Sequence, residues 1–184
     1  MNVFLDSSVL LAASGSANGA SRGLFQLAPT AGWALLTSPY AISGVFKNIS
    51  KFPTEATSAW IGLRRRLGVV DDVVSLNRPV IFAASKDRPI LFTALASSRV
   101  LLTLDRADFA DILGGQFYGL RVRLPHEFIA EERALGRPVA QTLTGSLVVR
   151  GFAVHSPILR FSFPGLWSAE QLLHQASVSV FYEG

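Results

Sequence analysis

Aspartates that follow two apolar segments are the residues in this sequence best placed to do chemistry. Asp6 ends the apolar segment 1–5 and is the only carboxylate in the first 54 residues. Asp105 ends the segment VLLTLD in the same way, and Asp108 follows three residues later. Asp87 opens the helical stretch that precedes this segment. A charge beside a buried strand is costly without a partner, so we expect these carboxylates to have one.

Convergence of these aspartates would create a cation site. If segments 1–5 and 100–104 are neighbouring parallel strands, Asp6 and Asp105 meet where open parallel sheets bind ligands, and Asp87 reaches them from a helix N-terminus. Clustered carboxylates raise one another's pKa unless a cation compensates. Mg²⁺ prefers such oxygen ligands, and a bound divalent ion can activate water against a phosphodiester. The pattern therefore indicates a metal-dependent nuclease.

Structural roles compete with this interpretation for several of the acids. Asp87 and Asp108 are good candidates for helix N-caps, and capping alone would explain them. Asp71 and Asp72 are typical of a turn after a strand. Asp6 and Asp105 are harder to explain in this way, because capping requires no aspartate after each of two apolar strands.

Alternation of short apolar segments with helical ones predicts how these residues are held. Strands are expected at 1–5, 34–37, 69–70, 100–104 and 118–124, and helices at 20–27, 41–51, 54–67 and 88–97. Within 41–51, the spacing of Ile42, Val45, Phe46 and Ile49 predicts one buried stripe. Gly68 is the expected end of the helix 54–67. The fold class is α/β, a three-layer α/β/α sandwich with a central, mainly parallel sheet.

The composition changes near residue 130. We expect one domain over 1–129 and a C-terminal extension over 130–184, which begins with a helix at 129–135. Segments 146–154, 158–163 and 178–182 are rich in Val, Phe and Ile, which predicts a β-rich extension around one helix at 169–175. Its apolar side chains would be covered by the domain, by a homodimer partner or by extension of the sheet edge.

Composition excludes several classes of protein. The absence of cysteine excludes a disulfide scaffold, a thiolate zinc site and a cysteine nucleophile. The three histidines are scattered and form no HExxH motif, which argues against a zinc hydrolase. No apolar segment is long enough to span a membrane, and we expect a cytoplasmic protein. The net charge of +4 permits an anionic partner. Arg64, Arg65 and Arg66, with Lys47 and Lys51, would either contact RNA phosphates or form a solvated helix end.

Several segments resemble the PIN-domain family of ribonucleases, which includes the toxins of bacterial toxin–antitoxin pairs. The matching segments are VFLDSSVLLAA at 3–13, SRGLFQLA at 21–28, SPYAISGVFKNI at 38–49, SKDRPILFTALASSRVLLTLDRADF at 85–109 and GLRVRLPHEFI at 119–129. The resemblance implies a Rossmann-like sandwich that cleaves RNA with Mg²⁺ or Mn²⁺. It places Asp6, Asp87 and Asp105 at catalytic metal-ligand positions and Asp108 at a fourth, with Ser8 and Thr103 as supporting hydroxyls.

One departure from the family pattern concerns its second acid, a glutamate on the helix after the second strand. That position falls on Ser43 and Gly44, and neither residue carries a carboxylate. Two hypotheses follow. The first is a metal-dependent ribonuclease, with an antitoxin as a partner if it is a toxin. The second is a catalytically degenerate PIN-like protein that binds RNA or another protein.

Overall fold

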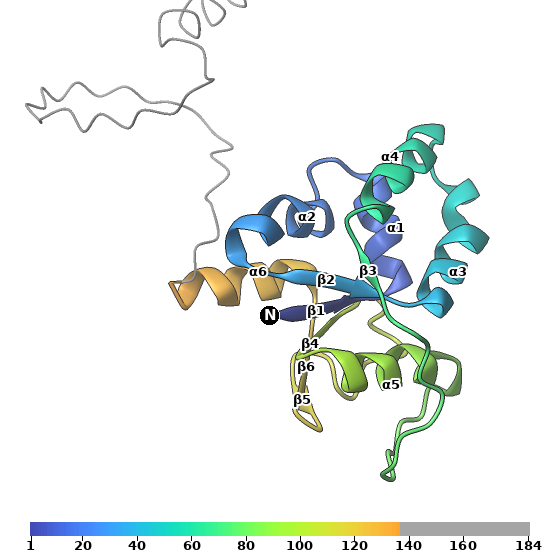
Figure 1. Cartoon of the computed structure of the whole chain (residues 1–184), viewed down its shortest axis with the longest axis vertical. Coiled ribbons are helices and arrows are strands. Elements are labelled where there is room, and N and C mark those ends of the chain that lie inside the picture. Colours follow the sequence, from blue (N-terminus) through green and yellow to red (C-terminus); the bar gives the residue numbers. More distant parts are fainter. Residues whose placement is uncertain (137–184) are drawn as a thin grey trace, which may run out of the picture. The chain divides into compact units, whose positions relative to one another are not determined.

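The computed structural model of the protein describes residues 1–136. These residues form a six-stranded sheet with helices on both faces (Figure 1). The strands are β1 (Asn2–Leu5), β2 (Ala34–Thr37), β3 (Gly68–Val69), β4 (Val100–Leu102), β5 (Gln116–Phe117) and β6 (Leu120–Arg123). The helices are α1 (Ser7–Gly15), α2 (Ala20–Ala31), α3 (Pro39–Asn48), α4 (Thr54–Arg64), α5 (Arg88–Ser97) and α6 (Pro125–Ala134), with two 3-10 turns, η1 (Ile49–Lys51) and η2 (Ser85–Asp87). The expected three-layer α/β/α sandwich is confirmed.

The strand order of the sheet is β3-β2-β1-β4-β6-β5, and every pair is parallel except β5 with β6. From β1 the chain builds outward through β2 and β3, and then returns to add β4 on the other side of β1. The sheet therefore has its topological switch point between β1 and β4, whose carboxyl ends are where such sheets bind ligands. Leu5 pairs with Leu102 in the register, so Asp6 and Thr103 follow at the same edge.

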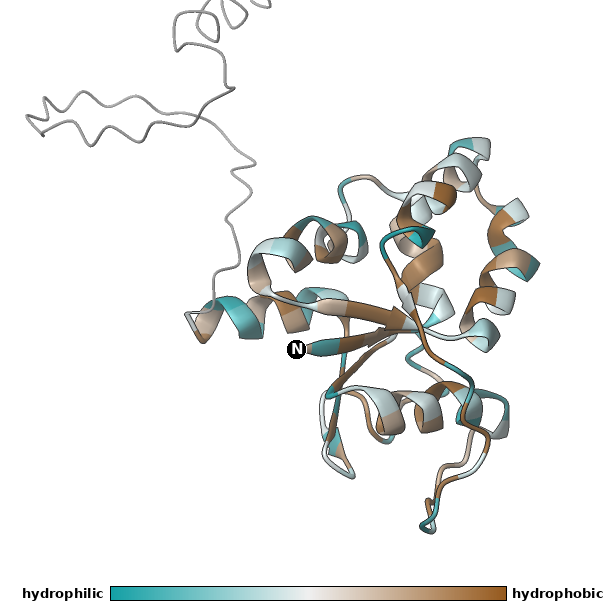
Figure 2. Cartoon of the chain, viewed as in Figure 1, coloured by the Kyte–Doolittle hydropathy of each residue, from teal (hydrophilic) through white to brown (hydrophobic). Residues whose placement is uncertain are grey.

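Alternating side chains of the central strands enter two separate cores. Val3 and Leu5 of β1 pack in the core under α1, α2, α4 and α6, whereas Phe4 packs in the core under α5. Leu101 of β4 shares the core of Phe4. Because both faces are covered, the central strands β1, β2 and β4 are mainly apolar, as the brown colouring in Figure 2 shows.

Several element boundaries differ from those expected. The helix expected to end at position 67 ends at Arg64, and Gly68 is the first residue of β3 rather than a helix stop. The strand expected over 118–124 is β6, which is shorter at both ends. It forms a hairpin with β5, which was not predicted, through Tyr118 and Gly119 with φ of 49° and 89°. Positive φ at two successive residues is typical of a tight hairpin turn. Of the two residues, only the glycine indicates such a turn in the sequence.

The helix expected over 41–51 is α3 followed by η1, and its predicted apolar stripe is only partly buried. Ser38 caps α3 through its side chain, which accepts a hydrogen bond from Ala41 N. Val45 and Ile49 are buried, but Phe46 is 65% exposed and contacts only the edge of the core. The stripe prediction is therefore wrong for Phe46, because α4 covers its ring only by an edge contact with Trp60 and leaves the rest exposed.

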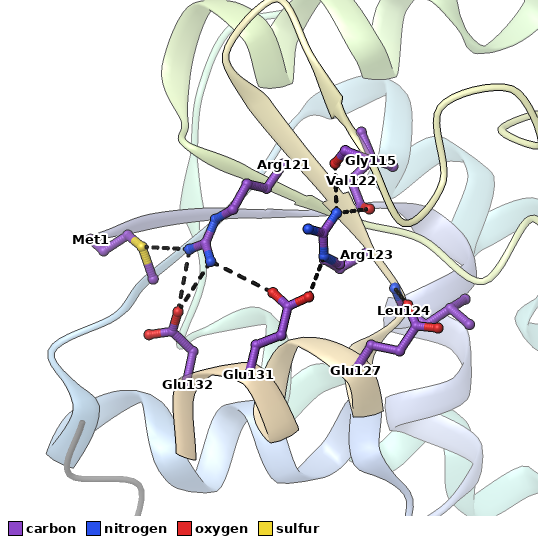
Figure 3. A network of polar contacts seen from close by, with 9 residues as sticks. All are labelled: Met1, Gly115, Arg121, Val122, Arg123, Leu124, Glu127, Glu131 and Glu132. Atoms are coloured by element: carbon purple, nitrogen blue, oxygen red, sulfur yellow. Dashed lines mark hydrogen bonds and ion pairs between the residues drawn. The ribbon is translucent and has the colours of Figure 1, made fainter. Parts of the chain in front are cut away.

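A charged network joins β6 to α6 (Figure 3). Glu132 is fully buried and accepts hydrogen bonds from the Arg121 guanidinium, with Nη2 at 3.3 Å from Oε1. Arg123 Nε donates to Glu131 Oε1 at 2.6 Å. These bonds join α6 to β6. The helix expected over 129–135 is α6, which begins at Pro125, so position 129 lies inside it. The domain boundary at 129/130 stays a prediction.

The elements expected at 146–154, 158–163, 169–175 and 178–182 lie outside the described residues. Within residues 1–136, every helix is too short or too polar to cross a membrane.

Candidate metal centre

Three of the four aspartates singled out from the sequence meet at the switch point of the sheet. One carboxylate oxygen from each of Asp87, Asp105 and Asp108 lies within 4.8 Å of the other two. Asp105 and Asp108 belong to the segment after β4, while Asp87 ends η2 and directly precedes α5. The sheet therefore brings together acids separated by about twenty residues, as the topological argument required.

Asp105 is oriented by its own turn. Its Oδ1 accepts hydrogen bonds from the backbone N–H groups of Ala107 at 3.1 Å and Asp108 at 2.9 Å. Its backbone N–H donates to Thr103 Oγ1 at 3.0 Å. Asp105 thus has a capping role that the sequence interpretation assigned to Asp108, and no helix of the described chain begins at Asp108.

Asp6 is 5% exposed and is held by hydroxyl groups. Its Oδ2 accepts hydrogen bonds from Ser8 Oγ at 2.6 Å and Thr103 Oγ1 at 2.9 Å, and its Oδ1 accepts one from Ser7 Oγ at 3.1 Å. The expected support by Ser8 and Thr103 is present. The group of carboxylates within 4.8 Å, drawn from residues 1–136, does not include Asp6, although its charge contributes to the raised pKa of Asp87.

Asp87 occupies the N-cap position of α5 but makes no side-chain capping bond. Its Oδ2 is buried and has no hydrogen-bond partner among residues 1–136. Burial, followed by the nearby charge of Asp108, raises the pKa of Asp87 to about 6. A buried carboxylate oxygen without a donor is the atom that a cation would complete, so these oxygen donors fit a hard divalent ion.

Lys86 is a member of this centre that sequence reasoning missed. Its Nζ lies 2.5 Å from Asp108 Oδ2. This contact holds the pKa of Asp108 below its usual value and raises the pKa of Lys86. One ammonium group faces three carboxylates, so the cluster keeps excess negative charge when no other cation is bound. Its only sequence signal is adjacency to Asp87.

Tyr40 and Asp72 link the start of α3 to the centre. Both carboxylate oxygens of Asp72 accept from the backbone N–H of Tyr40, at 3.1 and 3.0 Å. Tyr40 Oη in turn donates to the backbone carbonyl of Lys86 at 2.7 Å. Sequence reasoning treated Asp72 as a turn residue, because contacts across 32 and 46 positions have no local signature.

Gly44, where the family pattern has its second acid, packs against α1. A Cβ atom at Gly44 would lie 2.9 Å from Ser7 Cβ and 3.1 Å from Ser7 Oγ. The centre therefore has no carboxylate from α3, and the backbone at this position approaches α1 closely.

Comparisons with known proteins found similar solved structures at low identity. VapBC2 from Rickettsia felis, solved bound to a DNA fragment from its promoter, is 15% identical, with 66% of this chain and 97% of that chain covered and a TM-score of 0.48. Mycobacterium tuberculosis VapC20, a toxin that cleaves the sarcin–ricin loop, is 14% identical, with 59% and 94% covered and a TM-score of 0.38. No family model and no curated protein matches the sequence. Residues 1–136 have the three-layer α/β/α arrangement, with a mainly parallel sheet, that the sequence resemblance implied.

Proposed function

We propose that the chain is a metal-dependent ribonuclease that hydrolyses RNA phosphodiester bonds. The observation that carries the proposal is the group of Asp87, Asp105 and Asp108 at the switch point, with a buried carboxylate oxygen that has no partner in the described chain. Mg²⁺ or Mn²⁺ suits these donors. When bound there, such an ion would activate water and stabilise the leaving oxygen.

The protein side chains would contribute orientation and charge. Asp105 is fixed by two backbone N–H groups, and Asp6 by three hydroxyl groups, so neither carboxylate has to be ordered when a ligand binds. The four aspartates Asp6, Asp87, Asp105 and Asp108 are the proposed metal site, and Asp6, Asp87 and Asp105 its catalytic members. Asp6, outside the close group, would act on the ion through its charge or through a bound water.

A metal titration tests the proposal before any substrate is known. We expect Mn²⁺ binding in calorimetry with the full-length protein, and loss of most of that binding in Asp105→Asn. An asparagine keeps the oxygen that accepts from Ala107 and Asp108, so this variant should retain its circular dichroism spectrum. Asp111→Asn, an exposed aspartate outside the cluster, is the matched control.

Cleavage of single-stranded RNA should then require Mn²⁺ or Mg²⁺, stop with EDTA and be lost in Asp105→Asn. Equal binding and cleavage by wild type and Asp105→Asn would refute the assignment. A toxin role adds the expectation that expression arrests growth, and that an antitoxin encoded nearby relieves the arrest. We also propose that the protein is cytoplasmic.

The second candidate is a degenerate protein of the same fold that binds RNA or a protein without cleaving. The observation that favours it is Gly44, which leaves α3 without an acid and packs on Ser7. Metal binding without cleavage of any RNA tested would favour this candidate. Cleavage that depends on Asp105 would exclude it.

A further inference from the structure

The net charge of the protein is concentrated in one segment. Residues 39–66, which contain α3, η1, α4 and the two residues after α4, carry five cations and a single carboxylate, Glu55. The rest of the chain has twelve basic and twelve acidic residues. The formal charge of +4 therefore equals the net charge of this segment, which favours contact with a polyanion. The five cations are Lys47, Lys51, Arg64, Arg65 and Arg66.

Two of these cations line an open groove of about 560 Å³ between α3 and the segment from the end of α4 to β3. The other lining side chains are apolar or hydroxyl-bearing, and no carboxylate is among them. Phe46 supplies an exposed aromatic ring, whose edge contact with the buried Trp60, at a centroid distance of 6.3 Å, holds it in place. The groove is lined chiefly by Pro39, Ile42, Phe46, Lys47, Arg64 and Val69.

Contacts of Tyr40 link the start of α3, where the groove begins at Pro39, to the acidic cluster. Pro39 lines the groove, and the next residue, Tyr40, is 43% exposed. Tyr40 Oη donates to the carbonyl of Lys86, whose ammonium group contacts Asp108. An extended ligand that lies on Phe46 and passes Tyr40 would therefore arrive at the proposed metal centre.

We infer that this groove binds single-stranded nucleic acid, with a base stacked on Phe46 and with Lys47 and Arg64 against its phosphates. Aromatic rings combined with cations are the features of single-strand binding that tolerate any base sequence. A purely apolar peptide would leave both cations of the groove without a counter-charge. The inference rests on the proposed function for the identity of the ligand, and it assigns the approach path of that ligand.

Binding of a fluorescein-labelled 12-nucleotide RNA to the full-length protein, measured by anisotropy in EDTA, tests the inference without cleavage. Phe46→Ala should weaken binding about tenfold, and Phe46→Trp should restore it. Ile61→Ala removes an exposed apolar side chain of α4 that does not line the groove, and should leave binding unchanged. Circular dichroism should be the same for all three variants.

The charge test compares two double variants of equal net charge. Lys47→Gln with Arg64→Gln should lower the slope of log affinity against log salt by about 1.4, the value for two phosphates on a single strand. Lys51→Gln with Arg65→Gln removes two cations of the same segment that do not line the groove, and should lower it less.

Unchanged affinity in Phe46→Ala, or equal losses in the two double variants, would overturn the inference. So would a change of oligomeric state in Phe46→Ala without a change in RNA affinity, since the groove would then be a protein interface. Failure of the proposed function gives a different result. RNA binding through the groove without Mn²⁺ binding would support this inference and contradict the proposed nuclease. Mn²⁺ binding without RNA binding in the groove would support the nuclease and contradict this inference.

Discussion

The metal-free protein should be more stable when the charge of Asp87 is removed. Its carboxylate is partly buried beside Asp105 and Asp108, and burial is the main cause of its raised pKa. Asp87→Asn keeps the shape of the side chain and removes the charge. We therefore expect the variant to unfold at higher urea concentration than wild type in EDTA at pH 7.5.

The size of the gain follows from the pKa of Asp87, about 6 in the folded protein against an ordinary value of 3.8. The folded state holds its proton longer than the unfolded state, so the charge costs stability as pH rises through this window. At about 1.4 kcal/mol per unit the full penalty is roughly 3 kcal/mol. Partial exposure and screening reduce this, so we expect a gain of about 1–2 kcal/mol above pH 6.5.

Urea unfolding followed by circular dichroism at pH 7.5 and pH 4 measures this difference. The advantage of Asp87→Asn should shrink toward zero at pH 4, where wild type is itself largely protonated at this site. Asp111→Asn should show no such dependence on pH. The argument that the partly buried charge of Asp87 destabilises the metal-free protein would be refuted in two cases. One is a variant no more stable than wild type at pH 7.5, and the other is the same gain in stability at both pH values.

Two further predictions concern ion pairs of very different burial. Lys86→Met should tighten Mn²⁺ binding a few-fold in calorimetry, because the Lys86 ammonium group contacts Asp108 Oδ2 and competes with the ion. Lys51→Met, which removes an exposed ammonium group that contacts Asn48, should leave Mn²⁺ binding unchanged. Weaker binding in Lys86→Met would show that Lys86 supports the ion rather than competing with it. Glu132→Gln should lower the free energy of unfolding in urea by about 1–3 kcal/mol, since Arg121 loses a buried charged partner. Glu131→Gln, at a half-exposed residue, should lower it by about 1 kcal/mol or less. Equal losses in the two variants would argue against burial as the cause.

The architecture could be predicted from the sequence because its strands are buried on both faces. Segments such as 1–5 and 100–104 are mostly apolar, and an aspartate directly after each marks the carboxyl edge of the sheet. The hairpin of β5 and β6 could not be predicted, since its strands are two and four residues long and the turn depends on positive φ at Tyr118. The exposure of Phe46 was also missed, because periodicity reports a helix face but not how far a neighbouring helix covers it.

The candidate site was predictable to the extent that it follows the sheet. Asp105 and Asp108 lie just beyond β4, and Asp87 just before α5, so the strand order brings them together. The contacts that tune the site come from elsewhere. Lys86 reaches Asp108 across 22 positions, and Tyr40 reaches the Lys86 carbonyl across 46, and neither distance has a pattern in sequence.

Gly44 and Ser7 explain together why the centre lacks an acid from α3. A Cβ atom at position 44 would press on Ser7, whose hydroxyl group donates to Asp6 Oδ1. A glutamate introduced at Gly44 would therefore displace the side chain that helps to hold Asp6, as well as adding a carboxylate. The close approach of α3 to α1 and the missing acid are one structural feature. Among residues 1–136, the proposed metal chemistry would therefore rest on Asp87, Asp105 and Asp108, with Asp6 held by its three hydroxyl partners.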